Sequence, residues 1–150
     1  MLKQIYKIAF CVIVFGAFTF NAHAADNQCM PIGGTGLGDA MNETHFVAAM
    51  SGTFTGAHAQ VTNRKPTETG LILDIEHYFI SDKGGFLKTK DKATLTAVPG
   101  KDQVYMIEIT YNVIEALGAY TGYKGTFNSF GLMKLGEGKV IVRYTGELCK

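Results

Sequence analysis

The segment Leu71–Ile80, LILDIEHYFI, decides the fold class because its residues alternate between two kinds of side chain. The odd positions carry Leu71, Leu73, Ile75, His77 and Phe79. The even positions include Asp74, Glu76 and Tyr78. Successive side chains of a β-strand point to opposite faces of the sheet. The alternation therefore predicts a strand with one face in the core and the other in water.

The same period of two extends along the chain in both directions, and no window shows a helical period. Segments rich in β-branched and aromatic residues are predicted to be strands at His45–Phe54, Ala57–Asn63, Leu71–Ile80, Phe86–Val98, Val104–Ile114, Tyr123–Lys134 and Val140–Leu148. Glycine-containing turn signals such as Thr69-Gly70 and Pro99-Gly100 separate them. The spacing predicts an all-β protein, a single antiparallel β-barrel of about eight strands, a size that can hold one small ligand.

The first residues have the three parts of a secretory signal peptide. Lys3 provides a basic start, Ile8–Phe20 is an apolar run, and Ala22 and Ala24 are the small residues of a cleavage site. The run is shorter than the roughly twenty residues of a membrane-spanning helix, so no stable membrane anchor is expected. Residues 1–24 are predicted to be removed, and the mature protein is expected in the periplasm or outside the cell.

The mature chain is divided into two parts by composition. Residues 25–43 are predicted to form a flexible, glycine-rich lead-in, and residues 44–150 a β-barrel domain. Within the lead-in, Gly33–Gly38 is similar to a phosphate loop in glycine count alone, since no strand precedes it and the lysine of such loops is missing.

Two cysteines remain after cleavage, Cys29 and Cys149, near the two ends of the chain. An oxidising compartment favours a disulfide, which would be worth roughly 4–5 kcal/mol on the chain-entropy model. Two free thiols and a metal pair are the alternatives, but the cysteines lack the close spacing of zinc ligands.

The charge pattern argues against nucleic acid as a partner. The formal net charge is +1, and only Lys83–Lys92 gathers several lysines. This stretch, which also contains Asp82 and Asp91, is predicted to be a solvated strand or loop. His45, His58 and His77 have no short ligand spacing, so neither a metal nor a cofactor is expected. No strand is marked as a free edge, and the sequence predicts no oligomeric state.

If the apolar faces point inward, the barrel interior is mostly aliphatic, with His77, Tyr111 and Tyr144 as its polar groups. These three residues are the predicted ligand contacts in a pocket for a mostly apolar molecule. His77, Glu76 and Tyr111 are the catalytic candidates, because each can donate or accept a proton. A histidine on an apolar face is also compatible with a purely structural role.

The opposite strand faces offer a second group of charges, formed by Asp74, Glu76, Glu108 and Arg143. They are predicted to form ion pairs on the outer surface. Were that face interior, the charges would need partners and could form a site for acid–base chemistry.

A glycine-rich, aromatic hairpin pattern carries a family resemblance. Gly118–Phe127 (GAYTGYKGTF), Gly138–Gly146 (GKVIVRYTG) and Ser51–Gly56 (SGTFTG) together resemble the allene oxide cyclase and dirigent-like barrels and their exported bacterial relatives. The resemblance implies an eight-stranded, calycin-like antiparallel barrel with an apolar cavity. Plant members steer the cyclisation or coupling of reactive, largely apolar intermediates. The resemblance transfers no individual catalytic residue to this chain.

Three functions follow as hypotheses. The first is an exported barrel that binds a small, mostly apolar molecule in its lumen. The second is a cyclase or isomerase of the dirigent or allene oxide cyclase type, in which confinement and a proton donor accelerate a reaction. The third is an envelope protein or inhibitor that acts through its outer surface.

Overall fold

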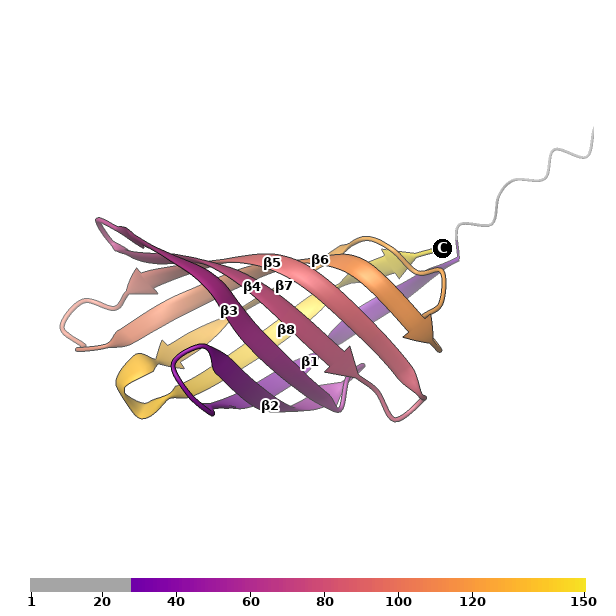
Figure 1. Cartoon of the computed structure of the whole chain (residues 1–150), viewed down its shortest axis with the longest axis horizontal. Coiled ribbons are helices and arrows are strands. Elements are labelled where there is room, and N and C mark those ends of the chain that lie inside the picture. Colours follow the sequence, from indigo (N-terminus) through magenta and orange to yellow (C-terminus); the bar gives the residue numbers. More distant parts are fainter. Residues whose placement is uncertain (1–27) are drawn as a thin grey trace, which may run out of the picture.

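The computed structural model describes residues 28–150, and the predicted signal peptide lies outside them. The described chain forms β1 (Cys29–Ala40), β2 (His45–Gly52), β3 (Gly56–Thr67), β4 (Gly70–Ile80), β5 (Gly85–Ala97), β6 (Val104–Gly118), β7 (Thr126–Lys134), the single 3₁₀ turn η1 (Leu135–Glu137) and β8 (Lys139–Cys149) (Figure 1). No helix within residues 28–150 has the length and apolar character needed to cross a membrane.

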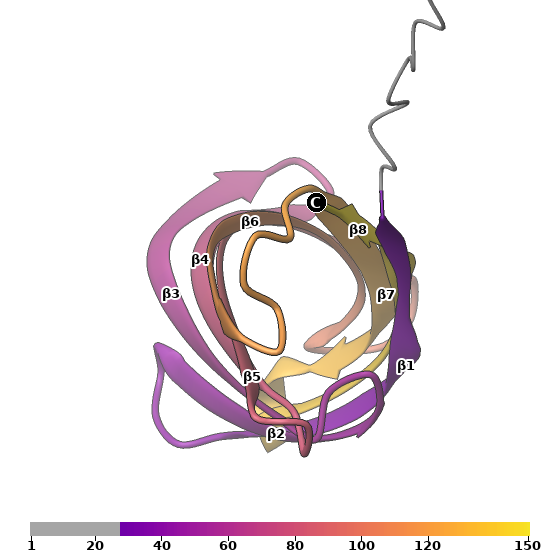
Figure 2. The same ribbon diagram turned by 90° about the vertical axis from the view of Figure 1, so that its right-hand side faces the viewer.

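The eight strands form a closed barrel in which each strand pairs with its neighbour in the sequence and β8 returns to pair with β1. Every pairing is antiparallel. Figure 2 shows the strands surrounding a central space, with the segment after β6 crossing one opening. The predicted fold class, a single antiparallel barrel of eight strands, is confirmed.

The glycine-rich lead-in was predicted wrongly, because most of it is strand β1. This strand pairs along its length with β8 and over Gly34–Ala40 with β2. Its inward positions include Gly34, Gly36 and Gly38, so it has no run of large apolar side chains to reveal its period. Backbone pairing on both sides makes it a strand, since without it β2 and β8 would each have an open edge.

The predicted disulfide is present and lies at this closing seam. Cys29 and Cys149 are bonded, and they face each other directly in the register of β1 and β8. The bond therefore joins the first and last strands of the barrel across 120 residues of sequence.

The apolar faces of β4, β6 and β8 point inward, and their side chains fill most of the interior. Around Phe54, which is fully buried, the rings of Phe79, Tyr120, Phe127 and Tyr144 lie 4.7–5.9 Å away between centroids. A second part of the core is aliphatic, with Val61, Leu73, Ile75, Leu95, Ile107, Ile109 and Met133. The polar groups of the lumen lie beside these two clusters.

Candidate functional site

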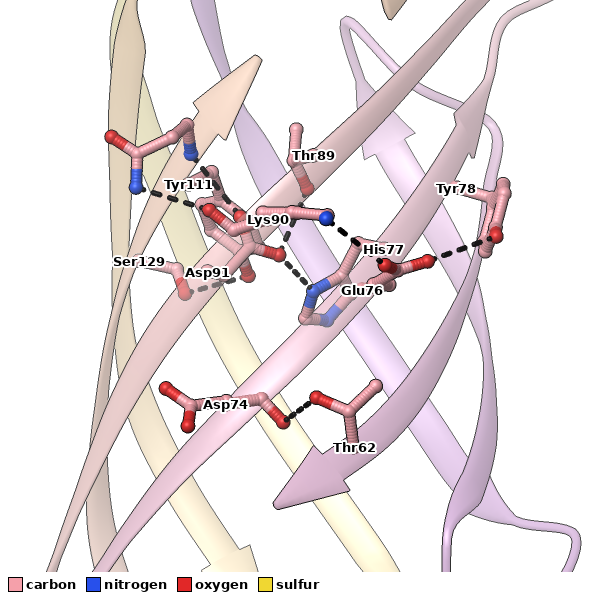
Figure 3. A network of polar contacts seen from close by, with 11 residues as sticks. Thr62, Asp74, Glu76, His77, Tyr78, Thr89, Lys90, Asp91, Tyr111 and Ser129 are labelled. Atoms are coloured by element: carbon pink, nitrogen blue, oxygen red, sulfur yellow. Dashed lines mark hydrogen bonds and ion pairs between the residues drawn. The ribbon is translucent and has the colours of Figure 1, made fainter. Parts of the chain in front are cut away.

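A buried histidine and aspartate form the most polar feature of the lumen. His77 on β4 and Asp91 on β5 both point inward, and His77 Nδ1 lies 2.7 Å from Asp91 Oδ2. The exposed fraction of the side chain is 9% for His77 and 0% for Asp91. Figure 3 shows the two side chains together, with Thr89 next to the carboxylate.

Asp91 is surrounded by hydrogen-bond donors. Its Oδ2 accepts from the Thr89 hydroxyl at 2.8 Å and also contacts His77 Nδ1, and its Oδ1 accepts from the Asn112 backbone N–H at 3.1 Å. Burying a carboxylate without partners would be strongly unfavourable. These contacts replace its lost hydration and hold the carboxylate in one orientation.

The second nitrogen of the His77 ring is available for other contacts. Nε2 makes no hydrogen bond to any residue within 28–150, and Figure 3 draws a contact to the other ring nitrogen alone. Among the described residues, no fully buried side-chain nitrogen or oxygen lacks a partner. Nε2 therefore retains accessible surface, although it lies in the lumen.

Two small cavities lie beside His77, with volumes of ≈60 and ≈50 Å³. Both are lined by Phe46, Ala59, His77, Ile109 and Val140. The larger one also borders small residues of β1, β2 and β3, namely Gly38, Ala48 and Ala57. Each cavity exceeds the roughly 10–15 Å³ that one water needs, but both are far smaller than the roughly 300–1,000 Å³ of pockets for drug-sized ligands.

The two predicted tyrosine contacts use their hydroxyls within the protein. The Tyr111 hydroxyl lies 2.9 Å from the Ser129 hydroxyl, and burial raises the pKa of Tyr111. The Tyr144 hydroxyl donates to the Ser51 carbonyl at 2.8 Å and accepts from the Phe54 N–H at 3.1 Å. Burial raises the pKa of Tyr144 as well. Tyr111 lines the larger cavity, whereas Tyr144 lines neither.

Glu76 lies on the outer wall, with the sheet between it and His77. Its carboxylate is 3.0 Å from Lys88 Nζ and 3.8 Å from Lys90 Nζ. The hydrogen bond from Lys88 holds the pKa of Glu76 below its usual range. Because neighbouring residues of a strand face opposite ways, Glu76 cannot act with His77 on a molecule in the lumen.

The other charges of this outer group also face away from the lumen. Asp74 Oδ1 lies 2.9 Å from Lys92 Nζ, and hydrogen bonds from Lys92 and Asn63 lower the pKa of Asp74. Glu108 and Arg143 are exposed. The outward direction predicted for the four charges is therefore confirmed. Lysines of β5 are the ion-pair partners of Asp74 and Glu76, whereas the ion pairs predicted for Glu108 and Arg143 do not form within residues 28–150.

Asp91 is the site residue that sequence reasoning missed. It was assigned to a solvated lysine-rich stretch, yet it is 4% exposed, while Lys90 and Lys92 face outward. The alternation of β5 could have placed it, because Leu87, Thr89, Ala93 and Leu95 share its parity and are all buried. The surrounding lysines obscured that signal.

Potential metal ligands gather at one place within residues 28–150. This group of three consists of Cys29, Glu147 and Cys149, and the disulfide engages both of its sulfur atoms.

No family model, curated protein or solved structure matches this chain. The function is therefore inferred from the geometry of the lumen.

Proposed function

We propose that the barrel binds a small, mostly apolar molecule in its lumen, in the two cavities beside His77. One observation carries the proposal: His77 Nε2 is accessible and has no partner among residues 28–150. The side chains around the two cavities are apolar except for His77 and the Tyr111 hydroxyl. An apolar enclosure with few directed polar groups is the usual composition of a small-molecule site.

The size of the cavities restricts the ligand. At ≈60 and ≈50 Å³, both are well below the roughly 150 Å³ of an engineered cavity that binds benzene, so a single small ring or a short branched chain would fit only with some enlargement of the lining. Met50 lines the larger cavity and Met133 the smaller. Methionine side chains adapt easily to a new neighbour, so a modest enlargement around a ligand requires no change in the strands.

The proposed location is outside the cytoplasm, in the periplasm or beyond. The sequence of residues 1–24 supports export, and the disulfide between Cys29 and Cys149 suits an oxidising compartment. The bound molecule would then be one that reaches the protein after export.

A second candidate is a cyclase or isomerase related to the allene oxide cyclase and dirigent-like barrels. The closed eight-stranded barrel is compatible with that relationship. The hydrogen bond between Asp91 and His77 favours this candidate, because a carboxylate that orients an imidazole is a common arrangement for proton transfer. If His77 transfers a proton, His77→Gln should abolish turnover of the compound found bound in the lumen but retain its binding.

Native mass spectrometry of the mature protein tests lumenal binding. We expect protein purified gently from its exporting host, or incubated with extracts of that host, to carry a small additional mass. Ala59→Leu should remove this mass, because Ala59 lines both cavities and a leucine would fill them. Ala49→Leu, on the exposed face of β2, is the matched control and should leave the mass unchanged.

Two outcomes would contradict the proposal. Additional mass that persists in Ala59→Leu would place the ligand outside the lumen. Wild-type protein that stays free of any ligand would support the third hypothesis, action through the outer surface.

A further inference from the structure

We infer that Asp91 fixes the tautomer of His77 and thereby makes the lumen selective for ligands that carry an O–H or N–H donor. This inference rests on the proposed function, because it concerns a molecule bound beside His77. It assigns a positioning role to Asp91 and names the chemical class of the ligand: a small, mostly apolar molecule with one hydrogen-bond donor.

The first step is the direction of the hydrogen bond between the two residues. The Asn112 backbone N–H can only donate, and the Thr89 hydroxyl donates to Oδ2. Both contacts suit a carboxylate, which accepts and has no proton to give. Across the 2.7 Å contact, His77 Nδ1 must therefore be the donor.

The second step is the state of the other ring nitrogen. A neutral imidazole has one N–H donor and one acceptor nitrogen. With the proton on Nδ1, Nε2 is an acceptor, and a ligand that donates a hydrogen bond would satisfy it. A ligand with an acceptor alone would face an unsatisfied lone pair.

The third step is that the ring is held in place. His77 stacks on Phe79 with ring centroids 5.5 Å apart and an interplanar angle of 13°. The ring of Tyr111 packs at 5.0 Å and 74° to His77. These contacts and the bond to Asp91 hold the ring with Nε2 away from the carboxylate.

The lining offers no comparable competing contact among the described residues. His77 and Tyr111 are the residues with polar side chains around the two cavities, and the Tyr111 hydroxyl is engaged with Ser129. The hydrogen-bond preference of the site therefore depends on Nε2.

Pyrrole and furan are the probes that test this preference. They are five-membered rings of the same size, but pyrrole presents an N–H donor where furan presents a weak acceptor oxygen. In mildly alkaline buffer, we expect the wild type to bind pyrrole roughly three- to tenfold more tightly than furan, measured by NMR titration.

Asp91→Asn should remove or reverse this preference. The carbonyl of the substituted side chain would still accept from the Asn112 N–H, while its amide would donate to Thr89 Oγ1 and His77 Nδ1. Because the number of partners is preserved, we expect the variant to fold. His77 would then carry its proton on Nε2, and pyrrole would lose its acceptor. Asp74→Asn is the matched control, because it removes a carboxylate from the outer wall.

The nitrogen-15 chemical shifts of His77 report its tautomer without any ligand or variant. The inference requires the Nδ1–H tautomer in the wild type, and Nε2–H in Asp91→Asn supports it. An Nε2–H tautomer in the wild type would overturn the inference. So would a ratio of pyrrole affinity to furan affinity that stays the same in Asp91→Asn although the tautomer of His77 has reversed. If pyrrole and furan bind equally, this inference fails alone. If neither pyrrole nor furan binds, the proposed function fails as well.

Discussion

At the scale of single residues, lumenal tyrosine hydroxyls serve the barrel. Tyr144 bridges the Phe54 N–H and the Ser51 carbonyl, and so ties β8 to the end of β2 and to the connection between β2 and β3. The sequence pattern predicted the same hydroxyl as a ligand contact. Its partners lie 90 and 93 residues away in the sequence, so only the folded chain reveals them.

Tyr144→Phe should therefore reduce stability and leave binding in the lumen unaffected. The change leaves a buried N–H without its partner, which destabilises a protein by about 1–3 kcal/mol. Urea unfolding monitored by circular dichroism measures the difference in free energy. Tyr123→Phe is the control, because the part-exposed Tyr123 side chain contacts Lys150 and should shift the free energy by less than about 0.5 kcal/mol. Equal stabilities of the two variants would refute the structural role.

At the scale of elements, β1 shows how a strand can form without large apolar residues. Adjacent glycines in it have different surroundings. A Cβ atom at Gly34 would lie 1.8 Å from the Ser51 carbonyl oxygen, whereas one at Gly33 would meet its nearest atom, the Tyr144 carbonyl oxygen, at 3.7 Å. The close approach of β1 and β2 thus requires glycine at position 34, whereas position 33 tolerates a side chain.

Gly34→Ala and Gly33→Ala are a matched pair that tests this packing. Gly34→Ala should destabilise the protein by about 1–3 kcal/mol or more, because the backbone of β2 must shift. Gly33→Ala should be neutral or stabilise by up to about 1 kcal/mol, through a less flexible unfolded chain. Thermal unfolding by calorimetry compares the two, and a larger loss for Gly33→Ala would show that the register of β1 is wrong.

At the scale of the whole molecule, closure of the barrel and the disulfide coincide. The ladder between β1 and β8 is the contact that joins the ends of the described chain, and the Cys29–Cys149 bond lies at one end of that ladder. The disulfide therefore resists separation of β1 and β8, the paired strands that lie farthest apart in the sequence.

Cys29→Ser with Cys149→Ser should lower the free energy of unfolding by about 5 kcal/mol, the chain-entropy value for a loop of this length. Hydrogen exchange should show the greatest loss of protection in β1 and β8. Reduced wild-type protein should behave like the double variant. An unfolding midpoint that is the same with and without the disulfide would contradict this account.

Much of the architecture follows from the sequence by itself. The period of two determined the all-β class, seven of the eight strands and the apolar faces of β4, β6 and β8, which point inward in the barrel. Cys29 and Cys149, the two cysteines outside the predicted signal peptide, indicated the disulfide. Strand periodicity is a local property, so each segment contains its own signal.

Other features depend on which strands become neighbours. Pairing with β2 and β8 made a glycine-rich segment into β1. The register of β4 and β5 placed Asp91 against His77 and buried it in spite of the lysines around it. The partners of Tyr144 and the cavities lined by Ala59 likewise arise from distant segments. Backbone pairing, burial and cavity volume are non-local quantities, and only the closed barrel determines them.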